Sequence, residues 1–150
     1  MSALFCGTLF SQENQSSRGQ IHGWYQADGQ YYFPDSLISA PVIPEKFLSN
    51  AFLNVNYTND GFSAGIRYES YQNVMTGFPS GYKGSGIPYR YIRYKHKDLD
   101  FTAGNFYDQF GSGLIFRSYE ARGLLFDNTV DGVRGIYTPG KGLTLKGFIG

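Results

Sequence analysis

The stretch Ala51-Phe-Leu-Asn-Val-Asn-Tyr-Thr-Asn-Asp-Gly-Phe-Ser-Ala-Gly-Ile-Arg-Tyr-Glu69 carries the clearest structural signal in this chain. Apolar and polar residues alternate on both sides of Asn59-Asp60-Gly61, and this alternation is typical of strands with two unlike faces. Asn, Asp and Gly tolerate a positive φ, so these three residues favour a tight hairpin turn. The stretch therefore predicts two antiparallel strands, over 47–57 and 62–71.

Similar segments follow along the chain, and the connections between them alternate in length. Short connections are expected at 58–61, 96–98 and 138–142, and long ones near 28–46, 72–87 and 108–130. The expected strands are 18–27, 47–57, 62–71, 88–96, 99–107, 131–137 and 143–150. Outer-membrane β-barrels have short turns at one end of their strands and long loops at the other. The sequence therefore predicts an all-β, antiparallel, up-and-down transmembrane β-barrel.

The composition excludes several other classes of protein. The chain has 150 residues, of which 20 are Gly, and aromatic residues make up 18%. No segment reaches the roughly 18 consecutive apolar residues of a membrane-spanning helix, so a membrane location would depend on strands. The net charge is +1, from 13 basic and 12 acidic residues, and no basic stripe indicates a nucleic-acid partner.

The residues at both ends of the sequence bear on the predicted domain organisation and location. Residues 1–11 combine a short apolar run with the small residue Ser11, which indicates the remnant of a secretory signal peptide. Residues 12–150 are expected to be the N-terminal part of a single barrel domain. One reason is that the sequence stops at Gly150 inside an apparent strand. A second is that seven strands are expected, whereas bacterial barrels have an even number of strands. The expected location is the bacterial outer membrane.

In such a barrel the polar face of each strand lines an aqueous lumen and the apolar face contacts lipid. Tyr and Phe residues lie at both ends of the expected strands, as two interfacial girdles require. The residues expected to line the lumen are Asn54, Asn56, Arg67, Glu69, Arg93, Lys95, Arg134 and Lys146. Alternation by itself fits equally well a soluble antiparallel sheet with one solvated face.

A second stretch carries a resemblance: Gly104-Asn-Phe-Tyr-Asp-Gln-Phe-Gly-Ser-Gly-Leu-Ile-Phe-Arg-Ser-Tyr-Glu-Ala-Arg-Gly-Leu-Leu-Phe-Asp-Asn-Thr-Val-Asp-Gly-Val-Arg-Gly135. It resembles an uncharacterised, porin-like family of Bacteroidota outer-membrane proteins, and the resemblance extends from residue 18 to the end. It implies a barrel fold and an envelope location, and it assigns no catalytic residue. Proteins of that family are much longer, which supports the interpretation as an N-terminal part.

The long connection 108–130 is unusually apolar for an external loop. Its apolar residues are expected to be buried: Leu114, Ile115, Phe116, Leu124, Leu125 and Phe126. One interpretation is a loop folded into the barrel, whose charged residues form a constriction, since rings of charge set pore selectivity. The candidate constriction residues are Arg117, Glu120, Arg122 and Asp127. The alternative is an extracellular flap that closes the barrel mouth.

The predicted function is that of a porin-like channel for small polar or anionic solutes, or of a structural barrel in an envelope complex. Outer-membrane lipid, small polar solutes and envelope lipoproteins are the expected partners. No cofactor or metal is expected, because His22 and His96 lie far apart and no cluster has metal-ligand spacing. No catalytic constellation indicates an enzyme. The alternative function is a secreted β-sandwich that binds glycans through exposed Tyr residues and Trp24.

Overall fold

The computed structural model describes residues 4–10, 19–33, 37, 44–73, 75, 83–121, 126–140 and 142–150. The chain forms two compact units. Unit 1 comprises Met1–Gln12, His22–Val55 and Arg67–Pro88, and unit 2 comprises Glu13–Ile21, Asn56–Ile66 and Tyr89–Gly150.

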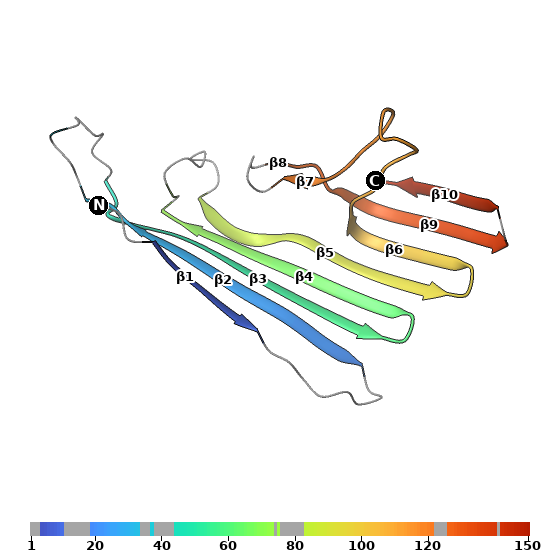
Figure 1. Ribbon diagram of the computed structural model, residues 1–150, viewed down its shortest axis with the longest axis horizontal. Coiled ribbons are helices and arrows are strands. Elements are labelled where there is room, and N and C mark those ends of the chain that lie inside the picture. The colour runs from blue at the N-terminus through green and yellow to red at the C-terminus, as the bar shows by residue number, and fades with distance from the viewer. Residues whose placement is uncertain are drawn as a thin grey trace. The chain divides into compact units, whose positions relative to one another are not determined.

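All regular elements among the described residues are β-strands (Figure 1). Seven of them correspond to the strands expected from the sequence: β2 (Gln20–Tyr31), β3 (Phe47–Asn59), β4 (Phe62–Gln72), β5 (Gly84–His96), β6 (Leu99–Phe106), β9 (Val130–Gly140) and β10 (Leu143–Ile149). The others are β1 (Leu4–Phe10), β7 (Glu120–Ala121) and β8 (Phe126–Asp127). The prediction of an all-β chain is therefore confirmed.

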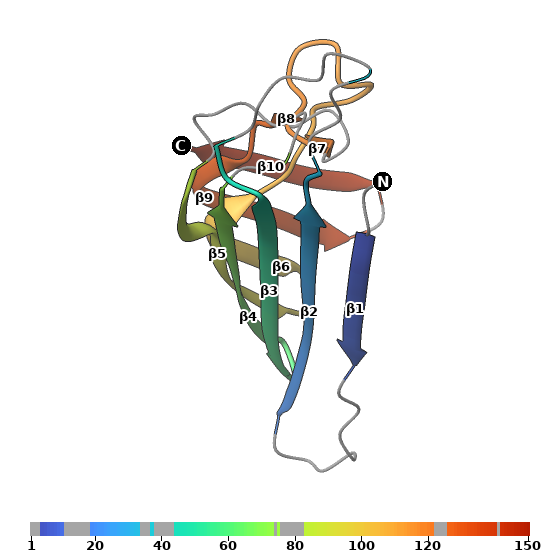
Figure 2. The same ribbon diagram turned by 90° about the vertical axis from the view of Figure 1, so that its left-hand side faces the viewer.

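The main sheet is antiparallel and follows the order of the chain. Its strand order is β1-β2-β3-β4-β5-β6-β9-β10, while β7 and β8 form a separate two-stranded sheet. Figure 2 shows β1 beside β2, and the register runs from Leu4 opposite Gln30 to Phe10 opposite Trp24. β1 and β10 each have one neighbour in this order, so the sheet is not closed into a barrel. The signal-peptide remnant expected over residues 1–11 is a statement about cleavage during secretion. The fold does not test it, so it stays a prediction.

No helix within the described residues is long and apolar enough to cross a membrane.

The alternation of short and long connections is confirmed. Short turns join β3 to β4 at Asp60–Gly61 and β5 to β6 at Lys97–Asp98, whereas residues 32–46, 73–83 and 107–129 separate other neighbouring strands of the main sheet (Figure 1). Asp60 and Lys97 both have a φ of 48°, the left-handed conformation that tight turns use. The Lys95 N–H donates to the carbonyl oxygen of Gly61 at 2.7 Å. A Cβ on Gly61 would lie 2.0 Å from the Lys95 carbonyl oxygen, so β5 approaches this turn too closely for a larger residue.

In unit 2 the registers of β5, β6, β9 and β10 align residues in rows across the sheet. On one face the rows are apolar, and the first consists of Ile92, Ala103, Val133 and Ile149. On the other face the rows are Arg93, Thr102, Arg134 and Phe148, followed by Lys95, Asp100, Ile136 and Lys146. Each strand therefore contributes to one apolar and one polar face, as the alternation predicts.

The two faces of these strands differ in exposure. Ile92, Val133 and Ile149 on the apolar face are 51%, 38% and 77% exposed. On the polar face Thr102 is 2% exposed and the Asp100 side chain 13%. A water-soluble sheet normally buries its apolar face and leaves the polar face in water. At these positions of unit 2 the arrangement is reversed, although Lys95 on the polar face is exposed.

Unit 1 shows the same tendency on β3 and β4. Asn50 is 3% and Arg67 5% exposed, whereas Leu53 on the other face of β3 is exposed. The Nε of Arg67 lies 2.8 Å from Oε1 of Glu69, and the Tyr71 hydroxyl donates to Oε2 of Glu69 at 2.8 Å. The buried Arg67 is thus held by a local ion pair, whose carboxylate also accepts a hydrogen bond from Tyr71.

Replacement of Gly61 by Ala is expected to lower the free energy of unfolding by about 1–3 kcal/mol, the usual cost of inserting a methyl group into a closely packed site. The physical reason is the Lys95 carbonyl oxygen, which would lie 2.0 Å from the new Cβ. Urea unfolding of the purified protein in detergent micelles measures this loss. Gly140→Ala is the matched control, because no described atom lies within 4 Å of a Cβ at Gly140. Equal losses in the two variants would contradict this explanation.

Candidate functional site

Asp108 begins a closed loop directly after β6. Its N–H donates to Oγ of Ser118 at 2.7 Å, and the Ser118 N–H donates to the Asp108 carbonyl oxygen at 2.7 Å. Further in, the Phe110 N–H donates to the Phe116 carbonyl oxygen at 3.1 Å. Residues 107–119 are therefore fastened at their two ends and form one compact segment, called loop 107–119 below.

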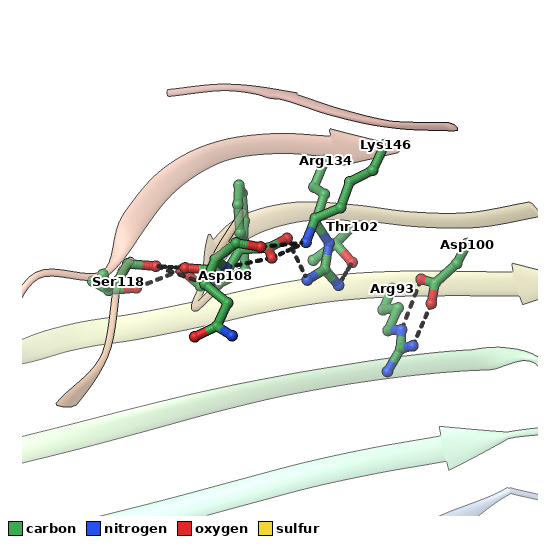
Figure 3. Close-up of polar contacts among 10 residues, drawn as sticks. Arg93, Asp100, Thr102, Asp108, Ser118, Arg134 and Lys146 are labelled. Carbon is green, nitrogen blue, oxygen red and sulfur yellow. Dashed lines mark hydrogen bonds and ion pairs between the residues drawn. The ribbon is translucent and has the colours of Figure 1, made fainter. Parts of the chain in front are cut away.

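The Asp108 carboxylate binds two cationic side chains of the polar face (Figure 3). Arg134 on β9 donates from Nη1 to Oδ2 of Asp108 at 3.2 Å, and Lys146 on β10 donates to Oδ1. The Gln109 N–H donates to the same Oδ1 at 2.6 Å. The side chains of Asp108, Arg134 and Lys146 are 6%, 14% and 24% exposed. These three residues, the Asp108 cluster, are thus largely removed from solvent.

Aromatic rings hold loop 107–119 against β10. Phe148 lies two residues after Lys146 on the same face, and its ring stacks on that of Phe110 with a centroid distance of 5.4 Å. Nζ of Lys146 lies 5.3 Å from the Phe110 ring centroid, and the guanidinium carbon of Arg134 lies 5.3 Å from that of Phe106. Cations placed over ring faces are stabilised electrostatically. The loop is therefore attached by both charge and apolar packing.

A second ion pair lies next to the Asp108 cluster. Nη2 of Arg134 donates to Oγ1 of Thr102 at 3.0 Å, which fixes the guanidinium on the β6 side. Arg93 on β5 donates from Nε to Oδ1 of Asp100 at 2.8 Å and from Nη2 to Oδ2, a bidentate contact (Figure 3). Bidentate pairs of this kind fix the orientation of both groups. The polar face of unit 2 thus carries two sets of charged contacts, the Asp108 cluster and the Arg93–Asp100 pair.

The electrostatics of the cluster keep Asp108 ionised. Burial by itself would raise the pKa of the Asp108 carboxyl, but hydrogen bonds from Lys146, the Gln109 N–H and Arg134, with the charge of Lys146, outweigh it. The pKa of Asp108 therefore lies below the ordinary value of an aspartate. One carboxylate then faces two cations, so the cluster has a net positive charge. Chemically, such a site can hold a further anionic group.

The sequence profile of one protein family matches the chain over residues 1–150, and the family is described as "Family of unknown function (DUF6029)". The chain belongs to this family. No curated protein and no solved structure matches it. The stretch 104–135 resembles an uncharacterised family, and membership of DUF6029 confirms that the chain's family is one of unknown function. The outer-membrane location that the resemblance implied stays a prediction.

In this DUF6029 member, half of the candidate lumen residues lie on the polar face of unit 2. They are Arg93, Lys95, Arg134 and Lys146. Arg134 and Lys146 meet at Asp108, whereas Arg93 binds Asp100. Asn56, also in unit 2, accepts a hydrogen bond from the Tyr91 hydroxyl at 3.3 Å. The structure thus brings these residues together, although their role as a lumen wall stays a prediction.

The remaining candidate lumen residues belong to unit 1. Arg67 and Glu69 form an ion pair with each other on β4. Asn54 on β3 is half-buried, and its Nδ2 has no hydrogen-bond partner among the described residues. Asn54 thus lies on β3, whereas the ion pair lies on β4.

Three of the candidate constriction residues lie among the described residues, and each has different contacts. Arg117 is exposed with its guanidinium carbon 4.8 Å from the ring centroid of Tyr119. Glu120 and Asp127 face each other as register partners of β7 and β8, and Asp127 accepts a hydrogen bond from the Tyr107 hydroxyl at 3.0 Å. Arg122 lies outside the described residues. Charged contacts in this region hold the loop together locally.

The expected burial of the apolar loop residues is wrong at three positions. Leu114 and Ile115 are each 92% exposed, and Phe126 is 41% exposed. Phe116 is half-buried and contacts Phe148 at a centroid distance of 4.9 Å. The hydrogen bond from the Phe110 N–H to the Phe116 carbonyl oxygen places residues 111–115 at the tip of the loop. Leu124 and Leu125 lie outside the described residues.

Sequence reasoning missed Asp108 as the centre of the site. One signal was available, because Asp108 follows the expected strand 99–107, and the next two expected strands carry the cations Arg134 and Lys146. What the sequence lacks is the path of loop 107–119, which brings the carboxylate to those cations. Within the described part of the chain, no three His, Cys, Asp or Glu side chains are grouped as metal ligands.

Asp108→Asn is expected to lower the free energy of unfolding by about 3 kcal/mol at neutral pH, because two largely buried cations lose their counter-charge. The folded protein holds Asp108 at a lower pKa than the unfolded chain does, so it binds fewer protons there. This contribution is fully present above about pH 4 and is lost as the pH falls through the lower folded pKa. Urea unfolding should therefore show the two proteins converging as the pH falls below about 4.

Asp131→Asn is the matched control for this change. Asp131 lies 3.2 Å from Arg90, but both side chains are more than half exposed, at 56% and 59%. An exposed pair contributes about 0–1 kcal/mol, so the control should lose little stability at any pH. A pH-independent difference between wild type and Asp108→Asn would contradict the assigned role of the carboxylate.

Proposed function

We propose that the protein is an outer-membrane β-barrel protein of the bacterial envelope. In this proposal the apolar strand face contacts lipid and the polar face lines an aqueous interior. Hydrocarbon offers no hydrogen-bond partners, so the open edges of the main sheet must be paired in the membrane. The narrower form of the proposal is a porin-like channel for small polar or anionic solutes.

The observation that carries the proposal is the reversed exposure of unit 2. Rows of large apolar side chains lie open on one face, whereas Thr102, Arg134 and the Asp108 carboxylate on the opposite side are largely buried. Contiguous exposed apolar surface of this kind marks contact with a membrane or a partner. Lipid matches it best, because the apolar rows run across four neighbouring strands and alternate with polar residues along each strand, as in transmembrane barrels.

Aromatic residues near the short turns give a second, weaker support. Phe62, Tyr94 and Tyr137 lie near the short turns of unit 2 on the apolar face and are 38%, 48% and 46% exposed. The Tyr57 ring lies beside Phe62 with a centroid distance of 6.2 Å. Tyr rings prefer the interface between lipid and water. This band is where an interfacial girdle is expected.

The proposed solute class follows from the charges of the polar face. On the polar face of unit 2 the cations are Arg93, Lys95, Arg134 and Lys146, and the anions beside them are Asp100 and Asp108. The excess of positive charge favours anions, since charged side chains along a pore set its selectivity. A structural barrel beside envelope lipoproteins would share the location without conducting solutes.

A secreted β-sandwich that binds glycans has less support. Its apolar face would be covered by a second sheet about 10 Å away. Among the described residues, the strands outside the main sheet are β7 and β8, which have two residues each. Trp24, the candidate residue for glycan stacking, is half-buried on β2.

The location is tested by fractionation of the full-length native protein, followed by gel electrophoresis of unheated and heated samples in detergent. We expect recovery in the outer-membrane fraction and a mobility that changes on heating, because a closed barrel resists unfolding by detergent. Recovery in the soluble fraction with no heat-dependent shift would overturn the proposal and favour the sandwich.

Val133→Arg tests whether the apolar face contacts lipid. In a bilayer the change is expected to cost about 2–4 kcal/mol near the midplane and less toward the interfaces, because an arginine replaces a lipid-facing valine. At an exposed position of a water-soluble sheet the same change would stay within about 0.5 kcal/mol. Urea unfolding from phospholipid vesicles measures the difference.

Thr144→Arg is the control for that substitution, because Thr144 is exposed on β10 and alternates with Leu143 and Leu145. An added arginine on this polar face should change stability little. If both variants lose the same stability, the cost comes from the arginine itself and not from lipid contact.

A further inference from the structure

The donors of the Asp108 cluster are only partly used by its one carboxylate. Arg134 donates to Asp108 from Nη1 and to Thr102 from Nη2. Its Nε is buried and has no hydrogen-bond partner among the described residues. Nζ of Lys146 donates to Asp108 and to the Gln109 carbonyl oxygen, both from loop 107–119. The cations come from the sheet and their anionic partner comes from the loop.

Because the Asp108 carboxylate belongs to loop 107–119, its contacts with Arg134 and Lys146 depend on where the loop lies. Ser118 is 5% exposed and is hydrogen-bonded to the main chain of Asp108, whereas the neighbouring Arg117 is exposed. Phe110, two residues after Asp108, stacks on Phe148 of β10. Release of the carboxylate would therefore loosen the loop and expose the peptide bond between Arg117 and Ser118.

We propose that Arg134 and Lys146 form a binding site for a small oxyanion, a carboxylate or phosphate group, and that Asp108 is an internal ligand that occupies it. With Asp108 bound, loop 107–119 lies on the polar face. With a free oxyanion bound, Asp108 is displaced and the loop is released. The site requires only the polar face of unit 2, whether or not the opposite face contacts lipid.

The donor set fits this ligand class. Guanidinium and ammonium groups bind carboxylate and phosphate oxygens through short, charge-assisted hydrogen bonds. A free phosphate has more oxygens than one carboxylate, so it can engage both cations and the unused Nε of Arg134. A group tethered by a short segment has an effective concentration in the millimolar range, on the order of 1 mM or more. Free phosphate should therefore displace Asp108 at roughly millimolar concentrations.

Limited digestion with trypsin tests the proposal on the wild-type full-length protein in detergent micelles. Inorganic phosphate is added at constant ionic strength, with acetate in a second series, and cleavage after Arg117 is followed by mass spectrometry. We expect this cleavage to accelerate with phosphate and to saturate. Cleavage after Lys97, in the exposed turn between β5 and β6, is the internal reference and should not change. Acceleration by acetate as well would assign a carboxylate site, and by phosphate alone a phosphate site.

Two variants sharpen the experiment. Asp108→Asn should be cleaved after Arg117 about tenfold faster without phosphate, and calorimetry should show it binding phosphate about tenfold more tightly than wild type does, because the internal competitor is gone. Asp131→Asn removes a carboxylate from the strand that carries Arg134 without touching the cluster, and it should behave as wild type. Lys146→Gln should remove the response to phosphate.

Unchanged cleavage of the wild-type protein over the whole phosphate range would overturn the proposal, and this arm does not depend on the folding of any variant. Equal acceleration after Arg117 and Lys97 would also overturn it, because the protein would then be loosened as a whole. A soluble protein that shows the phosphate response would overturn the membrane location alone.

Discussion

An antiparallel register that separates two unlike faces is the constraint on which the rest of the structure depends. The rows that begin at Ile92 and at Arg93 lie on opposite sides of the same four strands. A shift of one residue in any strand would exchange its faces and place charges among apolar side chains. Tight turns at Asp60–Gly61 and Lys97–Asp98 hold that register at one end of the strands.

Once the charged face is turned away from solvent, its charges need partners. A buried unpaired charge is costly, so Arg134 is held by Asp108, and the largely buried Asp100 is held by Arg93. Asp100 lies within the sheet, where the register supplies it directly opposite Lys95 and beside Arg93. Asp108 lies outside the sheet and must be delivered by the loop. The Arg93–Asp100 pair is therefore formed within the sheet, whereas the contacts of Arg134 and Lys146 with Asp108 depend on loop 107–119.

This difference links the architecture to function. A loop that lies on a charged face narrows the space above it, and a loop held largely by one carboxylate can be released by a competing anion. The tip residues Leu114 and Ile115 are exposed, so apolar burial of the tip does not hold the loop down. Its attachment depends instead on the Asp108 cluster and on the stacking of Phe110 on Phe148.

The sequence by itself determined the strands, their antiparallel order and the alternation of turns and long connections, because these depend on neighbouring residues and a two-residue period. It also grouped Arg93, Lys95, Arg134 and Lys146 on polar faces. Only the tertiary structure decided which face is exposed and that Asp108 completes the site. Leu114 and Ile115 show the limit, because burial depends on the path of a loop, and that path is set by contacts between residues far apart in the sequence.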